Sequence, residues 1–263
     1  MRIATWNLWG LNGDYVQRFQ MILEEVRELS SDLICFQELG LVDQSQVISD
    51  FVEQLHLLGY NLYTCDLSGS LRKSELVIAS KRIVSDVGEI VLDTDASDPC
   101  PRGALMVRLT GKQAVTVVTT HLDYRKWNSS LRKKQLKKIL GEARSFSKSS
   151  PLILCGDFNC PPTSDEVRAL KGEIEPYFPG LVFFDCWDFA DEGNGYTWLS
   201  SSPLTDFSFH GNSRIDYIMV EYEPDDCGLR ILGCSRIGNP VNGMWPSDHL
   251  GVFAEITWNG RMW

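Results

Sequence analysis

The strongest constraint on the fold comes from two short runs that are apolar on both faces of a strand. SDLICFQEL at 31–39 predicts a strand over residues 32–38, and PLILCGDFN at 151–159 predicts another. Such strands must lie inside a sheet that other elements cover on each side. Neither run approaches the roughly 20 apolar residues of a membrane-spanning helix. We therefore expect the chain to fold around interior strands.

Helical patterns and further strands surround these two runs. Apolar residues recur with a helical period from Asp14 to residue 29, over 45–57 and over 128–146. Strand-type runs lie at 2–8, 60–66, 75–80, 82–92, 103–109, 114–121, 181–184, 214–220, 228–237 and 250–258. No low-complexity linker divides them, so residues 1–263 are expected to form a single domain. We predict an α+β fold, a four-layer α/β-sandwich of two packed, mostly antiparallel sheets flanked by helices, with each half of the chain contributing a similar unit.

The composition limits the partners of the protein. The 263 residues include 25 Lys and Arg against 35 Asp and Glu, which gives a net charge of −10. A protein that coats long stretches of duplex DNA usually needs a broad basic surface, and this balance argues against one. A phosphate-bearing substrate would therefore have to meet a local basic patch or a metal ion.

The eight cysteines show no CxxC pair and no zinc-type spacing, and Cys35 and Cys155 lie inside apolar runs. We expect them to be reduced structural thiols. The sequence contains no membrane-spanning stretch and no N-terminal signal pattern. A cytoplasmic location is therefore the default expectation, together with a monomeric state.

Polar residues lie at the ends of the predicted strands. They are Asn7, Glu38, His121, Asp157, Asn159, Asp216, Asp248 and His249. A buried carboxylate is normally paired or bound to a metal, and strand ends that share a sheet edge would bring these groups together. Oxygen ligands without a Cys/His cluster favour Mg²⁺ or Mn²⁺, and histidines beside carboxylates suit acid–base chemistry. The set indicates metal-assisted hydrolysis of a phosphate ester.

Each of these residues also has a purely structural alternative. Asn7 could satisfy backbone groups at a strand end, and Asp216 could pair with Arg214. Asp157 and Asn159 could form a turn. Competing chemistries lack their motifs, because the sequence contains no GxxxxGK(S/T), GxSxG, HExxH or GxGxxG.

Six motifs follow one another along the chain: TWNLWG (5–10), ICFQEL (34–39), TTHLD (119–123), CGDFN (155–159), RIDYI (214–218) and PSDHLGV (246–252). In order and spacing they resemble the endonuclease/exonuclease/phosphatase superfamily, which has the deoxyribonuclease-I-like fold. The motifs extend from residue 5 to 252, so the resemblance covers nearly the whole chain. It implies a metal-dependent phosphoric ester hydrolase in which water attacks phosphorus in line.

The resemblance also implies a metal site. Glu38 corresponds to the principal metal ligand, and Asn7 lies beside it to contact metal or phosphate. Asp248 corresponds to a secondary metal ligand. The implied cofactor is Mg²⁺ or Mn²⁺.

Catalytic roles follow from the same resemblance. Asp157 corresponds to the residue that positions or deprotonates the attacking water, and Asn159 to its orienting partner. His249 corresponds to the histidine that contacts the scissile phosphate, with Asp216 as its carboxylate partner. His121 corresponds to a second phosphate donor that stabilises developing negative charge.

Substrate contacts are expected beside this set. Arg125 and Trp127 follow His121 closely and are placed to touch a phosphate or a base. Trp198, in the sequence YTW, could stack on a nucleobase or belong to the core. The basic stretch 125–148 is typical of a solvated helix face.

The subfamily is less clearly indicated. WNLWG and PSDHLGV are similar to 5′-tyrosyl-DNA phosphodiesterases, whereas GDFN and RIDYI equally resemble exonucleases and deadenylases. We expect a nuclease or DNA-end-processing phosphodiesterase that acts on a nucleic-acid end or single strand. The alternative is a sphingomyelinase- or inositol-phosphatase-like hydrolase of a lipid or small phosphoester, because these enzymes share the catalytic set. A catalytically inactive phosphate-binding module is disfavoured, because the acid, histidine and asparagine positions are all present.

Overall fold

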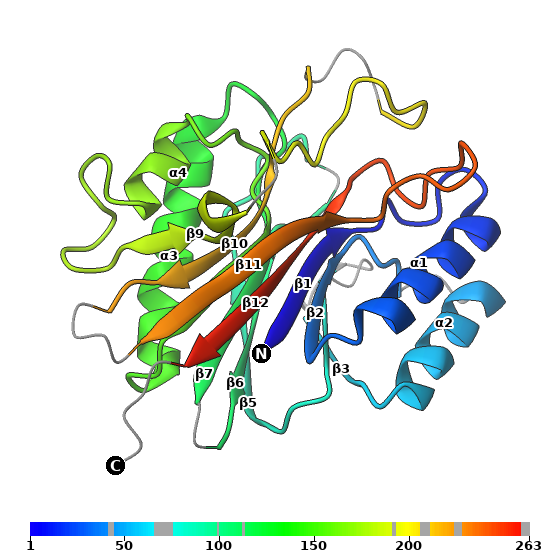
Figure 1. The fold of residues 1–263 in the computed structure, drawn as a ribbon. Coiled ribbons are helices and arrows are strands. Elements are labelled where there is room, and N and C mark those ends of the chain that lie inside the picture. The colour runs from blue at the N-terminus through cyan, green and yellow to red at the C-terminus, as the bar shows by residue number, and fades with distance from the viewer. Residues whose placement is uncertain are drawn as a thin grey trace.

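Two sheets pack face to face in the computed structural model, which describes residues 1–41, 45–65, 76–98, 100–111, 114–190, 193–205, 211–223 and 228–258 (Figure 1). The strands of the first sheet are, in order, β11 (Leu229–Ile237), β12 (Gly251–Trp258), β1 (Arg2–Asn7), β2 (Leu33–Gln37), β4 (Val77–Ser80) and β3 (Asn61–Thr64). Those of the second are β5 (Val84–Val91), β6 (Gly103–Leu109), β7 (Val115–His121), β8 (Leu152–Asp157), β10 (Asp216–Glu221) and β9 (Phe183–Asp185).

Each sheet contains one parallel pair within an otherwise antiparallel order. The parallel pairs are β1 with β2 and β7 with β8. Parallel neighbours need a crossover connection, and helices α1 (Tyr15–Leu29) and α3 (Ser129–Ser147) lie in these two connections. The predicted mostly antiparallel sandwich is therefore confirmed.

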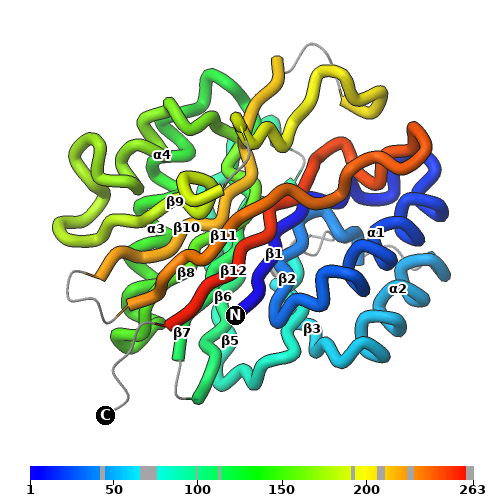
Figure 2. The backbone as a smooth tube through the Cα atoms, in the orientation of Figure 1, coloured from blue at the N-terminus to red at the C-terminus, as the bar shows by residue number. Residues whose placement is uncertain are grey.

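The two sheets are similar units, as expected, because each has two antiparallel pairings, one parallel pairing and two further antiparallel pairings in the same order, but the chain is not divided between them at its middle. The first sheet takes β11 and β12 from the C-terminal part of the chain, and β12 pairs antiparallel with β1. Figure 2 shows these red and blue segments side by side. The first sheet is therefore assembled from both ends of the described chain, and the second sheet from its middle.

Helices cover the outer face of each sheet. Helix α1 and helix α2 (Gln46–Leu57) lie on the first sheet, and α3 and α4 (Asp165–Leu170) lie on the second. Helix α1 begins at Asp14, whose side chain accepts a hydrogen bond from the backbone N of Gln17.

Most predicted elements agree with the structure to within a few residues. Helix α4 and a 3₁₀ turn over Cys186–Phe189 were not predicted. Residues 66 and 75, at the ends of two predicted strands, lie outside the described residues, as does Cys227.

The apolar core fills the space between the sheets and the two spaces beneath the helices. Cys35 and Cys155 are fully buried between the sheets, and the described cysteines are free thiols, as expected. Among the described residues, no helix combines the length and apolar character needed to cross a membrane.

Candidate active site

The register of the second sheet aligns three polar side chains. His121 ends β7 opposite Asp157 at the end of β8, and Asp157 in turn lies opposite Asp216 at the start of β10. Directly paired residues on neighbouring strands point to the same face of a sheet. The three strands therefore place an imidazole and two carboxylates in one row.

Gly156 makes this row possible. Its φ of +128° is a conformation that side chains rarely adopt, and a Cβ atom there would lie 2.0 Å from the backbone O of Thr120. Only glycine allows β8 to approach β7 so closely immediately before Asp157.

The first sheet contributes Asn7 and Glu38. Asn7 ends β1 opposite Gln37, so Glu38 follows directly beyond the paired strand ends. Asn7 Nδ2 donates to Glu38 Oε1 at 3.1 Å and to Asp157 Oδ2 at 3.1 Å, and its Oδ1 accepts from the backbone N of Trp9 at 3.0 Å. Asn7 is buried and joins the polar groups of the two sheets.

The segment before β12 adds His249. Its backbone N donates to Ser247 Oγ at 3.2 Å, and that hydroxyl donates to the backbone O of Asn7 at 2.7 Å. His249 Nδ1 lies 2.9 Å from Asp216 Oδ2, and its Nε2 lies 3.8 Å from Asp157 Oδ2. The imidazole is therefore held between the two carboxylates.

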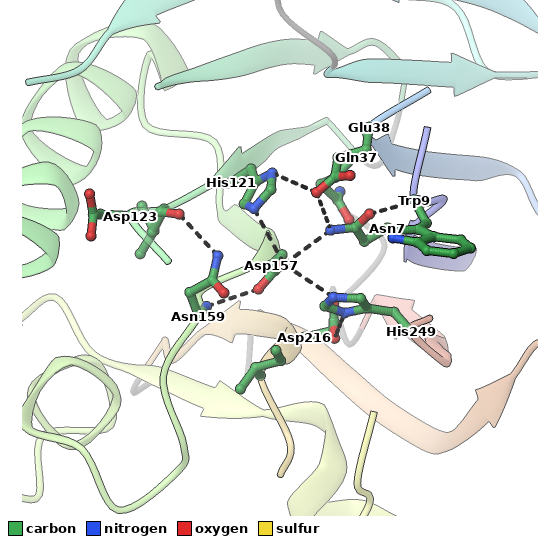
Figure 3. A network of polar contacts seen from close by, with 12 residues as sticks. Asn7, Trp9, Gln37, Glu38, His121, Asp123, Asp157, Asn159, Asp216 and His249 are labelled. Carbon is green, nitrogen blue, oxygen red and sulfur yellow. Dashed lines mark hydrogen bonds and ion pairs between the residues drawn. The ribbon is translucent and has the colours of Figure 1, made fainter. Parts of the chain in front are cut away.

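These side chains surround an open cavity of about 320 Å³. Figure 3 shows Asp157 at the centre of the polar network, with His121, Asn7, Asn159 and His249 around it. The cavity also has aromatic and basic walls, which come from Trp9, Arg102, Tyr124 and Trp198.

Burial and mutual repulsion disfavour the charged forms of two cavity carboxylates. Burial and the nearby Asp216 raise the pKa of Asp157 to about 7, despite the favourable charge of His249. Burial raises the pKa of Asp248 to about 6, with Glu38 adding repulsion that His249 opposes. These two carboxyl groups therefore retain a proton to higher pH than an exposed aspartate does.

The two histidines have opposite protonation preferences. Burial lowers the pKa of His249, but Asp216, Asp157 and Asp248 outweigh it and hold that pKa well above the usual value. Burial, together with the positive charges of Arg102 and His249, holds the pKa of His121 well below its usual range. At neutral pH, His249 is therefore a cation and His121 a neutral imidazole.

The donor set fits a hard divalent cation. Glu38, Asp157 and Asp248 line the cavity, whereas Arg102 is the one Lys or Arg side chain on its described walls. Mg²⁺ takes oxygen ligands and keeps several waters, and the Glu38 side chain is 27% exposed to solvent. Such an ion would offset the repulsion from neighbouring carboxylates, which adds to the effect of burial on the pKa values of Asp157 and Asp248.

A second grouping could also hold an ion, because ligand atoms of Asp157, Asp216 and His249 lie within 4.8 Å of one another. All three residues are buried, and His249 Nδ1 is already bonded to Asp216. Glu38, by contrast, is partly exposed, so water can reach its carboxylate.

Comparison with known proteins identifies the family. A model of the Endonuclease/Exonuclease/phosphatase family matches residues 4–249. The chain belongs to this family. Members of the Endonuclease/Exonuclease/phosphatase family hydrolyse phosphoesters, in keeping with the donor set of the cavity.

Two relatives within the family match nearly the whole chain. The chain is 26% identical to protein angel of Drosophila melanogaster, over 92% of this chain and 72% of that protein. It is 24% identical to tyrosyl-DNA phosphodiesterase 2 of Gallus gallus, over 97% of this chain and 66% of that protein. The chain thus spans just under two thirds of the second relative.

A solved structure shares the fold. The crystal structure of D. rerio TDP2 complexed with a single-strand DNA product matches with a TM-score of 0.76 and 19% sequence identity, over 98% of each chain. The four-layer sandwich is thus the fold of the Endonuclease/Exonuclease/phosphatase family.

The structure brings the predicted polar residues together. It decides between the two alternatives for Asp216, and it shows that both hold for Asp157 and Asn159. Asp216 bonds to His249, whereas Arg214 pairs with Asp185 at 2.6 Å. The backbone N of Asn159 donates to Asp157 Oδ1 at 2.9 Å, so this pair forms a turn and also lines the cavity.

The residues predicted to contact substrate have different surroundings. Arg125 is 5% exposed and is not part of the cavity wall, because its guanidinium pairs with Asp123 at 2.8 Å. Trp127 is 80% exposed and also lies outside that wall. Trp198 is buried, lines the cavity and packs edge-on against His249, with the ring centres 5.1 Å apart.

Arg102, Tyr124, Trp9 and Asn12 line the cavity but were not singled out in the sequence. Trp9 lies within the motif TWNLWG and Tyr124 directly follows TTHLD, so adjacency to the motifs was an available signal. Arg102 opens a predicted strand and carries no local signature.

Proposed function

We propose that this protein is a divalent-metal-dependent phosphodiesterase that cleaves nucleic acid, at an end or within a single strand. The observation that carries the proposal is the convergence of Glu38, Asp157 and the His249–Asp216 pair on one cavity. A hard-cation site, a water-orienting carboxylate and a cationic donor are the components of metal-assisted phosphoester hydrolysis.

Asp157 is the proposed water-orienting group. Its Oδ1 is fixed by the backbone N of Asn159 at 2.9 Å, and its Oδ2 by Asn7 Nδ2 at 3.1 Å. Asn159 Nδ2 donates to the backbone O of Leu122 at 3.0 Å, which holds the turn in place. A carboxylate fixed in this way can align a water with phosphorus and accept its proton when ionised.

His249 is the proposed cationic donor to the phosphate. Asp216 accepts from its Nδ1, so the Nε2–H of the imidazolium is left to face the cavity. His121, as a neutral imidazole, can donate one further hydrogen bond. Together they would stabilise charge on the non-bridging oxygens as the bond to the leaving group breaks.

Glu38, with Asn7 and Asp248 beside it, is the proposed holder of Mg²⁺ or Mn²⁺. A bound divalent ion would supply Lewis-acid polarisation of the phosphoryl group and neutralise its charge. Asn7 bonds Glu38 Oε1 at 3.1 Å, which limits the rotation of that carboxylate.

Charge favours a narrow contact with the nucleic acid. The chain carries a net charge of −10, so a long duplex would meet repulsion beyond the cavity. A free end or a single strand presents its phosphate with fewer neighbouring phosphates. The relatives support this choice, since one is a tyrosyl-DNA phosphodiesterase and a solved structure of similar fold holds a single-strand DNA product.

A substrate panel tests the proposal. The protein is assayed in EDTA, Mg²⁺ and Mn²⁺ against single- and double-stranded DNA, RNA, a 5′-phosphotyrosyl oligonucleotide, sphingomyelin and an inositol phosphate. We expect metal-dependent turnover of a nucleic-acid substrate that falls at least about 10²-fold in Glu38→Gln and His249→Ala. Preferred turnover of sphingomyelin or the inositol phosphate would overturn the substrate class.

Glu255→Gln is the matched control, because Glu255 is exposed and pairs only with Arg2 at 3.3 Å among the described ion pairs. Exposed pairs contribute little to stability, so this variant should retain wild-type activity. Full activity in Glu38→Gln would show that the assigned site is wrong.

A further inference from the structure

Trp9 has an unusual position at the edge of the cavity. It is half-buried and lines the cavity together with Glu38 and His249. Figure 3 shows it on one side of the polar network, with Asp123 on the other. The proposed reaction uses none of its side-chain atoms, so the placement of this large ring needs a separate explanation.

The backbone of Trp9 is strained. Its φ is +59°, in the left-handed region that bulky residues avoid at a cost of roughly 1–3 kcal/mol. In this conformation its backbone N donates to Asn7 Oδ1 at 3.0 Å, and the backbone N of Gly10 donates to the backbone O of Glu38 at 3.0 Å. Hydrogen bonds to Asn7 and Glu38 thus maintain the strained conformation.

The indole ring is also fixed in place, by a cation–π contact. The Arg18 guanidinium lies over the indole at 5.0 Å from its centre. That guanidinium cannot shift easily, because it donates to the backbone O of Leu8, Gly10, Asn12 and Pro246.

Gly13 lies close to the same ring. A Cβ atom there would lie 3.2 Å from Trp9 Cζ3, which is tighter than an ordinary contact. Arg18 and Gly13 pack against the indole, and Trp9 also lines the cavity, where a planar group of the substrate can meet it. This surface is rigid before any ligand arrives.

We propose that Trp9 is a specificity-determining residue whose indole stacks on the nucleobase next to the scissile phosphate. The inference rests on the proposed function and narrows its substrate. A base inside a duplex has both faces covered by its neighbours, so the indole selects a nucleotide that is already unstacked. Stacking on a fixed aromatic ring is tolerant of base identity, so selection is for an unpaired strand and not for a sequence.

The test uses two variants of Trp9. Trp9→Gly removes the ring and keeps the backbone, because glycine adopts a positive φ without strain and so preserves the bond to Asn7. Trp9→Phe keeps an aromatic face. Each is assayed with a single-stranded oligonucleotide in which one natural phosphodiester lies among methylphosphonate linkages. Matched oligonucleotides are abasic on the 5′ or the 3′ side of that bond.

We expect wild type to cleave the complete oligonucleotide with a kcat/KM about tenfold above that for one of the two abasic versions. Trp9→Gly should cleave the complete and abasic substrates with equal kcat/KM. Its KM for the complete oligonucleotide should rise, and its kcat should stay nearly unchanged. Trp9→Phe should retain most of the preference. Binding is also measured by fluorescence anisotropy in EDTA, with each Trp9 variant on a Glu38→Gln background. The affinities for the complete and abasic oligonucleotides should follow the same order as the kcat/KM values.

Phe189→Ala is the matched control, because Phe189 is an aromatic residue with 46% exposure that lies outside the cavity wall. Its preference should equal that of wild type. If Trp9→Gly lowers kcat equally on all substrates, Trp9 only positions Asn7 and the stacking inference is wrong. If wild type cleaves no oligonucleotide, the proposed function fails and the inference falls with it.

Discussion

Two histidines that line one cavity have pKa values shifted in opposite directions. The difference comes from their neighbours, because His249 lies among Asp216, Asp157 and Asp248, whereas His121 is buried near Arg102. The cavity thus contains a permanent cationic donor and a neutral imidazole from the same residue type.

Replacing Asp216 tests the origin of the His249 charge. Asp216 is the carboxylate that most raises the pKa of His249, so Asp216→Asn should let burial lower that pKa. The variant should lose roughly 10²-fold in kcat at pH 8, and less at pH 6, where the imidazole regains its proton. Wild type should show no such loss between these pH values. Parallel pH–rate profiles of the two proteins would contradict the assignment.

The pKa of Asp157 predicts how stability depends on pH in the absence of metal. It rises from about 4 in the unfolded chain to about 7 in the folded protein, so the folded state binds the extra proton between these values. The free energy of unfolding should therefore fall as the pH rises through this window.

Asp157→Asn should remove this loss. Urea unfolding in EDTA at pH 5 and pH 8 measures it, and we expect wild type to lose about 1–3 kcal/mol more than the variant. An equal loss in both proteins would mean that Asp157 is ionised at pH 5 in the folded state.

The polar cluster was predictable from the sequence because a carboxylate or histidine at the end of an apolar run is conspicuous. The aromatic and basic residues of the cavity wall were not predictable in this way. Arg102 and Tyr124 become neighbours only when the start of β6 meets the end of β7, which places the Arg102 guanidinium 5.6 Å from the centre of the Tyr124 ring. Arg125 lies outside the cavity wall for a related reason. Its spacing from His121 is compatible with substrate contact, but its guanidinium forms an ion pair with the buried Asp123.

Among the elements, β7, β8 and β10 do most to define the site. Their pairing fixes His121, Asp157 and Asp216 in one row, so a shift of one residue would turn a side chain to the opposite face. The contact between β8 and β7 tolerates substitution least in this arrangement, because Gly156 lies against the backbone of Thr120.

Gly156→Ala should therefore destabilise the protein by about 3 kcal/mol or more, or prevent folding, because the methyl group meets the backbone O of Thr120. Gly141→Ala is the matched control. Gly141 lies in α3, where a Cβ atom would be 3.5 Å from Phe178 in ordinary contact. That variant should be up to about 1 kcal/mol more stable. Thermal unfolding of the two variants checks both signs, and a stable Gly156→Ala protein would contradict the close approach.

Strands and helices were predicted well because their apolar periods are strong, whereas the pairing partners were not encoded locally. Nothing within residues 250–258 indicates that they pair with β1. Helix α4 was missed because six residues are too few to show a period.

At the scale of the molecule, the excess of negative charge lowers the stability of the metal-free protein and favours cation binding. We expect 10 mM Mg²⁺ or Mn²⁺ at pH 8 to raise the melting temperature by roughly 5–10 °C if the dissociation constant of the ion is about 100-fold below that concentration. The shift should shrink at pH 5.5, because Asp157 and Asp248, with pKa values of about 7 and 6, must lose protons first.

Glu38→Gln should abolish most of this thermal shift, and differential scanning calorimetry measures it. Glu255→Gln should behave as wild type. A shift that is equal in both variants would place the ion away from Glu38.

The pairing of β1 with β12 matters while the protein is being made. A ribosome releases Thr5 early and its partner Val252 only near the end of the described chain, and His249 emerges just before that partner. Throughout elongation, the first sheet has an open edge and the cavity lacks its cationic donor. A half-made chain therefore lacks both the β1–β12 pairing and the His249 side chain, so the cavity can be completed only after translation has passed these residues.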